Sequence, residues 1–325
     1  MMKKHSRGAA LLTAMLTVTL VATFAATSLW QQYRGVEVES AERERVQAAW
    51  VLTGALDWAR LILREDARTG GADNLSEPWA VPLAESRLSS FLAADRNNNA
   101  DVGEGTDTSE VFLSGQIVDA QARLNVMNLV DGANLSELGV QSFGRLFEVL
   151  GLPDAELKLL ANNLRVAMLV GTGGGGSLRP QRFDQLVWLG LSPTSLARLK
   201  PYATLLPFRT PVNLNTAGPE VIYAAVPSLS MAEARKLVEQ RTKQPFKSLS
   251  DVGIFLPEVA GLLTESQQSV GSRMYEVYGR LRMDKTIIQE VSLVRRDNLD
   301  VITVYRERTA LVDNPNALAA TPTLQ

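Results

Sequence analysis

The chain has 325 residues, of which 46% are apolar and 21% are charged, so it is long enough for one large domain or two ordinary ones. Its 33 basic and 35 acidic side chains give a formal net charge of −2, which provides no global attraction for nucleic acid or an acidic surface. It has no cysteine, and its one histidine is His5. This composition excludes disulfide frameworks, cysteine nucleophiles and histidine-based hydrolases or zinc enzymes, so we expect no enzyme activity.

A basic segment followed by a long uncharged run opens the chain. Lys3, Lys4 and Arg7 precede residues 9–30, which contain no charged side chain. At about 1.5 Å per residue in a helix, this run spans roughly 33 Å, enough to cross a bilayer. The basic residues predict a cytoplasmic N-terminus, with everything after Trp30 on the other side of the membrane.

A secretory signal peptide is the alternative for this segment, because it also begins with basic residues. Its apolar core would be about 7–15 residues long and would end at a small-x-small cleavage site. Ala22, Ala25 and Ala26 offer such a site. The observed apolar run is longer, which favours the membrane helix.

The start of the apolar run resembles a type IV prepilin leader, a short basic peptide that ends in glycine and is cut on the cytoplasmic side of an intact apolar helix. The resemblance implies cleavage between Gly8 and Ala9 and N-methylation of Ala9. Most such pilins carry glutamate five residues after the cut, where this chain has Thr13. That departure is typical of the K-type minor pseudopilin of the type II (general) secretion pathway.

The membrane helix is predicted to continue to about Arg68, because no proline occurs before Pro78. Apolar residues at helical spacing on one face of its outer half predict that this face packs on a globular domain. We call these residues the helix stripe: Ala49, Leu52, Leu56, Ala59 and Leu63. The alternative is a membrane anchor that is joined by a solvated linker to an independent domain. Gly35, Gly54 and the charged residues 37–45 are compatible with such a linker.

Residues 70–115 have little apolar periodicity and are predicted to form a loop. Oxygen ligands alternate along part of it, as they do in calcium loops. These candidate ligands are Asp95, Asn97, Asn99, Asp101 and Glu104. An EF-hand also needs glycine and glutamate where this chain has Ala100 and Thr106, so a calcium site of another type and a solvated loop both stay open.

The rest of the chain shows strand and helix patterns in turn. Residues 116–125 predict a β-hairpin. Short segments bounded by glycine and proline then predict helices over residues 141–150, 154–170, 182–189, 193–204, 219–225, 231–241 and 249–255. Alternating apolar and polar residues in 275–283, 290–296 and 301–306, with a turn at Asp297 and Asn298, predict an antiparallel meander.

These elements predict an α+β protein with a type IV pilin-like fold: a long N-terminal transmembrane helix and an antiparallel sheet, plus a large all-α (SAM-like) insertion. Residues 119–125 with Leu129, and residues 212–217, are similar to the two most recognisable motifs of the K-type pseudopilins. The expected parts are a leader (1–8), a transmembrane helix (9–30), a pilin core (31–130), a helical insertion (131–270), C-terminal strands (271–312) and a disordered tail (313–325).

Residues 212–256 also resemble the helix-hairpin-helix domain of periplasmic DNA-uptake receptors, so the alternative function is a membrane-anchored DNA-binding receptor. Such a module holds phosphates on backbone N–H groups of a glycine-containing hairpin. Here the hairpin at residues 227–230 has no glycine, and acidic residues offset the basic ones nearby. We therefore expect no nucleic-acid partner. The glycine run at 173–176 lacks the Gly-Lys-Ser/Thr of a phosphate-binding loop and is expected to be a linker.

Three tryptophans need a separate interpretation. Trp50, Trp58 and Trp188 lie in the predicted long helix and the predicted insertion. Large aromatic side chains usually contribute to cores, so we expect core or subdomain contacts there and no ligand platform.

The K-type resemblance implies a minor pseudopilin at the tip of the periplasmic pseudopilus of a type II secretion system, with a structural role in protein export. The implied partners are minor pseudopilins of the I and J types, the major pseudopilin, the prepilin peptidase and the inner-membrane secretion assembly. No cofactor is required, although K-type pseudopilins resemble one another in binding calcium. The implied location is the bacterial inner membrane, crossed once, with the globular domain in the periplasm.

Thr13 supplies a physical reason for the end position. A glutamate there would neutralise the buried N-terminal amine of the adjacent subunit, which offsets the cost of burying that amine. Without a carboxylate the chain is expected to join a filament from one side only, and the bulk of the insertion favours the same position. The helix stripe is the expected interface with partner helices.

Overall fold

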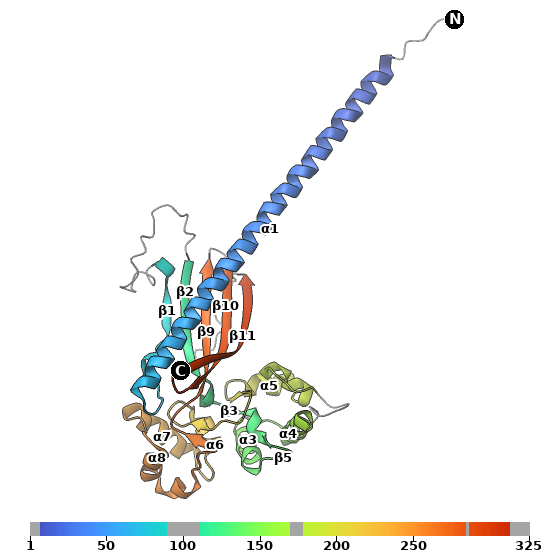
Figure 1. Cartoon of the computed structure of the whole chain (residues 1–325). Coiled ribbons are helices and arrows are strands. Elements are labelled where there is room, and N and C mark those ends of the chain that lie inside the picture. The colour runs from blue at the N-terminus through green and yellow to red at the C-terminus, as the bar shows by residue number, and fades with distance from the viewer. Residues whose placement is uncertain (1–6, 90–110, 170–177, 284–285, 313–325) are drawn as a thin grey trace, which may run out of the picture. The chain divides into compact units, whose positions relative to one another are not determined.

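The computed structural model describes residues 7–89, 111–169, 178–283 and 286–312 (Figure 1). The chain divides into two units, Met1–Gly54 and Ala55–Gln325. The calcium candidates at 95–104, the glycine run and the predicted disordered tail all lie outside the described residues.

Helix α1 (Arg7–Thr69) supplies all of the described structure in the first unit and continues into the second. It ends one residue beyond the predicted Arg68, and neither Gly35 nor Gly54 interrupts it. The linker alternative is therefore not supported. The helix is long and apolar enough to cross a membrane, with a mean hydropathy of 1.9 over its most apolar 18 residues.

Among the described residues, five antiparallel strands form one sheet in the order β1-β2-β9-β10-β11. They are β1 (Leu83–Arg87), β2 (Val111–Asp119), β9 (Met274–Met283), β10 (Thr286–Asp297) and β11 (Asp300–Val312). The predicted meander is confirmed as β9, β10 and β11, each longer than expected. The predicted loop at 70–115 is wrong in part, because it contains β1, the short helix η1 (Pro78–Ala80) and the first half of β2.

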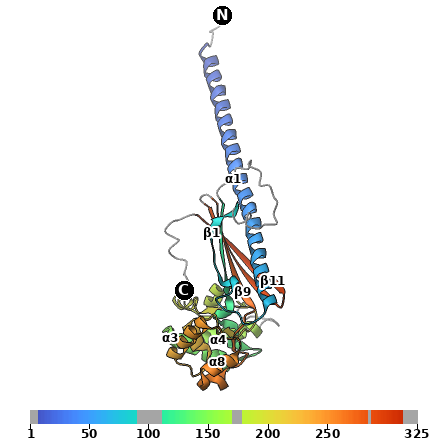
Figure 2. The same ribbon diagram turned by 90° about the vertical axis from the view of Figure 1, so that its left-hand side faces the viewer.

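The part of α1 in the second unit covers one face of this sheet (Figure 2). Leu56, Ala59 and Leu63 are buried against side chains of β2, β9, β10 and β11. Trp79 packs edge-on against Tyr275 in the same layer, with ring centroids 5.3 Å apart. This helix-on-sheet layer is the core of the pilin-like part.

The insertion leaves the sheet after β2 and returns at β9. Its helices are α3 (Glu137–Val149), α4 (Asp154–Leu169), α5 (Pro193–Leu199), α6 (Pro219–Ala225), α7 (Met231–Lys243) and α8 (Leu249–Phe255), with 3-10 turns η2 (Ala120–Ala122), η3 (Val126–Leu129), η5 (Phe183–Leu189) and η6 (Pro257–Leu262). One continuous apolar core joins the helices and the turns from η3 onward and also includes residues 124–130, whereas Ala120 of η2 packs in a separate cluster with Leu206, Met274 and Leu293. The helix predicted over 193–204 stops at Leu199, because Pro201 cannot continue it.

The predicted hairpin at 116–125 is wrong. Strand β2 pairs with β1 and β9, and β3 (Leu124–Asn125) pairs in parallel with β6 (Ala203–Thr204). Two further short pairs occur: β4 (Val130–Asp131) with β5 (Asn134–Leu135), and β7 (Val212–Asn213) with β8 (Gln268–Ser269). The Asp119 carboxylate caps η2 by accepting the Gln121 N–H at 2.7 Å, which turns the chain out of the sheet where a hairpin would return it.

The sheet-covering face of α1 predicts a contrast between two neighbouring leucines. Leu63 is fully buried and Leu61 is 55% exposed. Leu63→Ala should lower the free energy of unfolding by about 3 kcal/mol, because it removes buried methyl groups and leaves a cavity. Leu61→Ala, the matched control, should change it by less than about 0.5 kcal/mol. Denaturant unfolding of the detergent-solubilised chain, followed by tryptophan fluorescence, measures both, and equal losses would contradict the assignment of faces.

Candidate functional site

The predicted processing residues lie at the start of α1. Gly8 and Ala9 are in its first described turn. Thr13 is exposed, and its Oγ1 donates a hydrogen bond to the carbonyl of Ala10 at 2.9 Å. Thr17 and Thr27 return their hydroxyls to the helix backbone in the same way. Such bonds satisfy polar groups that lipid cannot, so the helix stays compatible with a membrane.

The helix stripe has one of its two predicted roles within the second unit: Leu56, Ala59 and Leu63 pack on the globular part, as predicted. These three residues are buried in the chain's own core, so they are not available to a partner helix, and this part of the predicted interface is wrong. The same residues cannot pack on the chain's own sheet and also bind a partner helix, so the two predictions are incompatible for these three positions. Ala49 and Leu52 belong to the first unit, and the packing within the second unit does not test them.

The prediction that these three tryptophans lie in a core is wrong. Trp50 is 71% exposed, Trp58 is 47% exposed and Trp188 is 53% exposed. Their size does not bring them into a core here, because the apolar faces of α1 and the insertion are filled by leucine, alanine and phenylalanine. Exposed tryptophans are frequent in binding surfaces.

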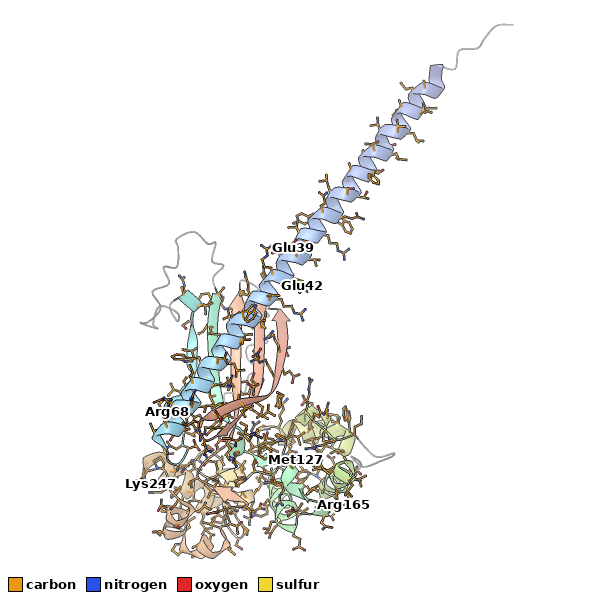
Figure 3. The ribbon with its side chains drawn as sticks, viewed as in Figure 1. Glu39, Glu42, Arg68, Met127, Arg165 and Lys247 are labelled. Carbon is orange, nitrogen blue, oxygen red and sulfur yellow. The ribbon has the colours of Figure 1, made fainter. Side chains whose placement is uncertain are left out.

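One of these tryptophans lies on a shallow surface cavity of about 300 Å³ along the last turns of α1. We call this surface the outer helix face: Trp58, Leu61, Ile62, Arg64, Glu65 and Arg68. Arg68, labelled in Figure 3, pairs with Glu65 at 2.9 Å. Trp58, Leu61 and Glu65 follow the i, i+3, i+7 spacing of a helix surface that packs against a second helix.

A buried carboxylate joins the insertion to the sheet. The Asp119 Oδ2 atom accepts hydrogen bonds from Asn213 Nδ2 at 3.0 Å, Thr216 Oγ1 at 2.6 Å and Ser272 Oγ at 2.6 Å. Asp119 is 2% exposed and pairs with no cation among the described residues. Burial raises its pKa, and the bonds from Ser272 and Thr216 offset part of that rise. We call these four residues the junction network.

A second carboxylate extends this network to α1 and the sheet. The Asp73 side chain accepts the Ser272 N–H at 2.6 Å and the Tyr275 hydroxyl at 2.8 Å, and it pairs with Arg296. Arg296 also pairs with Asp66, near the end of α1, at 2.6 Å. The end of the long helix, the start of β9 and the end of β10 are therefore held together by charge-assisted bonds.

The asparagines of the two recognisable motifs hold loops of the insertion. Asn125 accepts the Leu206 N–H at 3.2 Å and donates to the Phe208 carbonyl at 2.7 Å. Asn215 accepts the Phe246 N–H at 3.0 Å and donates to its carbonyl at 2.9 Å. Each asparagine side chain thus bonds both an N–H and a carbonyl of a loop backbone, as a neighbouring strand would do. These motif positions are therefore structural.

Sequence reasoning missed several residues of this site. Asp73, Ser272 and Arg296 lie outside the two motifs, and no local pattern marks them. Arg241 is 8% exposed and donates to the Leu214 carbonyl at 2.6 Å, and burial lowers its pKa to about 10. A basic residue on the apolar side of the 231–241 pattern is the one signal that could have identified it.

The described carboxylates include one cluster. Carboxylate oxygens of Asp66, Asp73 and Glu77 lie within 4.8 Å of one another. Arg296 pairs with Asp66 and Asp73, and the Trp79 indole donates to Glu77 at 2.6 Å. Each of these carboxylates therefore has a partner within the protein. The cluster is a component of the ion-pair arrangement, and the predicted calcium ligands are elsewhere in the sequence.

The α6–α7 hairpin does not have the features of a phosphate site. Ser228 adopts a φ of +62°, a left-handed conformation that glycine adopts more easily. The N-terminus of α7 is occupied by the Glu233 carboxylate, which accepts the Ser230 N–H at 2.8 Å and its hydroxyl at 2.6 Å. A negative side chain thus lies where a DNA phosphate would bind, which argues against the DNA-receptor alternative.

Comparisons with known proteins agree on one family. A family model described as Type II secretion system (T2SS), protein K, matches residues 212–270. A relative named Type II secretion system protein K, from Pseudomonas aeruginosa, is 26% identical over 94% of this chain and 90% of its own length. A relative of the same name from Pectobacterium carotovorum subsp. carotovorum is 24% identical over 85% of this chain and 86% of its own length.

A solved structure shares the fold. A chain in the crystal structure of the GspK-GspI-GspJ complex from the type 2 secretion system of enterotoxigenic Escherichia coli matches 83% of this chain and 98% of its own, with a TM-score of 0.64 and 18% identity. The predicted fold class and the predicted resemblance to K-type proteins are confirmed.

The junction network predicts a large effect from a small change. Asp119→Asn replaces one acceptor oxygen with an N–H₂ group, which leaves either Gln121 N–H or the three donors on Oδ2 without an acceptor. Denaturant unfolding at neutral pH should show a loss of about 1–3 kcal/mol. Asp184→Asn, at a carboxylate that is 72% exposed, is the matched control and should change little.

The pH dependence gives the same variant a second readout. Because the native pKa of Asp119 lies above the ordinary value of 3.8, the native protein binds this proton more tightly than the unfolded chain. The stability that Asp119 gains from holding this proton is fully present below the ordinary pKa. It is lost as the pH rises through the native pKa. The free energy of unfolding of the wild type should therefore exceed that of Asp119→Asn by less and less as the pH rises from about 4. An excess that grows with pH would contradict the raised pKa.

Proposed function

We propose that this chain is a K-type minor pseudopilin of a type II secretion system, located at the tip of the periplasmic pseudopilus and serving assembly and protein export. The observation that carries the proposal is the meeting of the two K-type motifs: Asp119 of the first accepts bonds from Asn213 and Thr216 of the second. The family match at residues 212–270 covers the second motif and the helices that follow it. No catalytic role is assigned to any described residue.

Minor pseudopilins of the I and J types are the partners, as they are for the protein in the solved GspK-GspI-GspJ complex. Within the second unit, the outer helix face is the part of α1 that faces them, since the opposite side of the helix is buried on the sheet. Its composition supports this choice, because tryptophan and arginine are enriched at the centres of protein interfaces. The major pseudopilin contacts the chain from one side only, because Thr13 offers no carboxylate.

The membrane anchor is α1, crossing once. Lys3, Lys4 and Arg7 support an inner-membrane orientation with a cytoplasmic N-terminus and a periplasmic globular part. In this arrangement the prepilin peptidase cuts between Gly8 and Ala9, Ala9 is N-methylated, and the inner-membrane secretion assembly receives the mature chain. Calcium binding by residues 95–104 is part of the proposal and needs no cofactor beyond the ion.

Site-specific crosslinking tests the partner surface. The chain has no native cysteine, so Leu61→Cys can carry a single benzophenone label. We expect adducts with the I-type or J-type subunit when the full-length chain is co-assembled with both. Leu262→Cys, on the insertion and 40% exposed, is the control and should give several-fold fewer adducts. Adducts only between copies of this chain, or equal yields from both positions, would contradict the assignment.

Mass spectrometry of the membrane-extracted protein tests the processing. The basic octapeptide ending in Gly8 predicts a mature chain that begins at methylated Ala9, because the cut precedes the apolar helix and leaves the anchor intact. Gly8→Leu should block the cut, since a bulky side chain obstructs the peptidase's approach to the backbone. A chain that begins near Ala26 or Thr27 would instead show a secretory signal peptide and would exclude a retained anchor.

A further inference from the structure

A cleft of about 400 Å³ separates the insertion from the edge of the sheet. We call it the edge cleft. Its insertion side is apolar, formed by Met127, Leu205, Leu206 and Pro207, and its strand side is formed by Val304 and Tyr305 of β11. Met127, which belongs to the insertion, is labelled in Figure 3. None of these residues belongs to the junction network or to the outer helix face.

A β-bulge shapes the strand side of this cleft. Leu293 pairs with Tyr305 and Val294 with Thr303, so Val304 is an extra residue in β11. Val304 and Tyr305 are 41% and 40% exposed, and both line the cleft. A bulge can redirect side chains beside a binding site. The result is two neighbouring side chains, aliphatic and aromatic, at the same opening.

No described strand pairs with the outer edge of β11 beside the cleft, although the Val301 carbonyl at the start of this stretch accepts a hydrogen bond from Arg60 Nε at 2.8 Å. In the part of the chain that the structure describes, β11 is the last strand of the sheet and pairs only with β10. The run from Val301 to Tyr305 contains no charge and no proline, and Ile302 is 47% exposed. An uncharged edge of this kind favours pairing with another extended chain unless something covers it.

The rim of the cleft is cationic. Arg179, Arg182 and Arg306 line it together with one acid, Glu307, and Arg306 is paired with Glu290 at 3.2 Å, so Arg179 and Arg182 are the arginines that the proposal uses. Arg182 pairs with Glu307 at 3.0 Å, but both side chains are well exposed, so this bridge contributes little and can exchange for another carboxylate. Arg179 donates to the Pro207 carbonyl at 3.0 Å, and its guanidinium has further N–H donors beyond the one in this bond.

We propose that the edge cleft binds an extended polypeptide segment of another protein, in which apolar side chains alternate with acidic ones. The segment pairs its backbone with the open edge of β11, places apolar side chains against Leu205, Pro207 and Tyr305, and presents carboxylates to Arg179 and Arg182. Side chains of a strand alternate with a period of two, so the apolar and acidic groups of such a segment form two separate rows along the added strand. This inference concerns a different surface from the outer helix face and does not depend on the secretion role.

A binding measurement with defined peptides tests the proposal. The probe is a fluorescein-labelled peptide, Glu-Val-Glu-Leu-Glu-Val-Glu, added to the full chain in neutral detergent and followed by anisotropy. We expect saturable binding, with no binding of the counterpart in which lysine replaces each glutamate. The double variant Arg179→Ala/Arg182→Ala should weaken binding of the acidic peptide at least tenfold, because it removes both carboxylate partners.

Two further variants separate the cleft from general charge attraction. Lys158→Ala/Arg165→Ala removes the same charge from α4, whose residues do not line the cleft, and should leave the affinity unchanged. Val304→Glu, at an exposed position, should weaken binding by at least as much as the arginine pair while leaving the melting temperature unchanged. Absence of saturable binding, equal losses for both double variants, or unchanged affinity in Val304→Glu would each overturn the proposal.

Discussion

The buried carboxylate of Asp119 is the interaction on which the architecture depends. It has no cationic partner among the described residues, so its charge is compatible with burial only while its four donors are in place. Those donors come from three separate stretches of the chain: the turn after β2, the second K-type motif and the start of β9. Insertion and sheet therefore form one cooperative unit, in which losing one segment leaves the others with unpaired polar groups.

Packing on the sheet gives α1 a buried face and an exposed face. The Asp66–Arg296 pair, with Asp73 on the same arginine, holds the end of the helix against the sheet, where Leu56 and Leu63 are buried. The helix then presents Trp58 and Leu61 outward. An anchor that doubles as the spine of the globular part thus leaves one helix surface for other subunits, which suits a component that assembles through its helix.

The insertion adds binding surface without disturbing that spine. It begins and ends at the junction network, on the side of the molecule where β2 and β9 meet, and its own apolar core makes it rigid. The edge cleft exists only because the insertion lies beside β11. A pilin-like sheet without the insertion would have the open strand but neither the apolar wall nor Arg179 and Arg182. The outer helix face and the edge cleft are thus available to different partners.

Local signals in the sequence determined the elements with short-range causes. The membrane helix follows from an uncharged run without proline, α6 from proline at its first position, and α8 from the Ser248–Asp251 capping box. The meander follows from alternation around a short turn. Tertiary structure alone decided the rest. Leu61 and Leu63 are equally apolar, and only packing on the sheet buries one of them. Asp119 looked like part of a hairpin because its partners, Asn213 and Ser272, lie 94 and 153 positions away in the chain, beyond the reach of any local pattern.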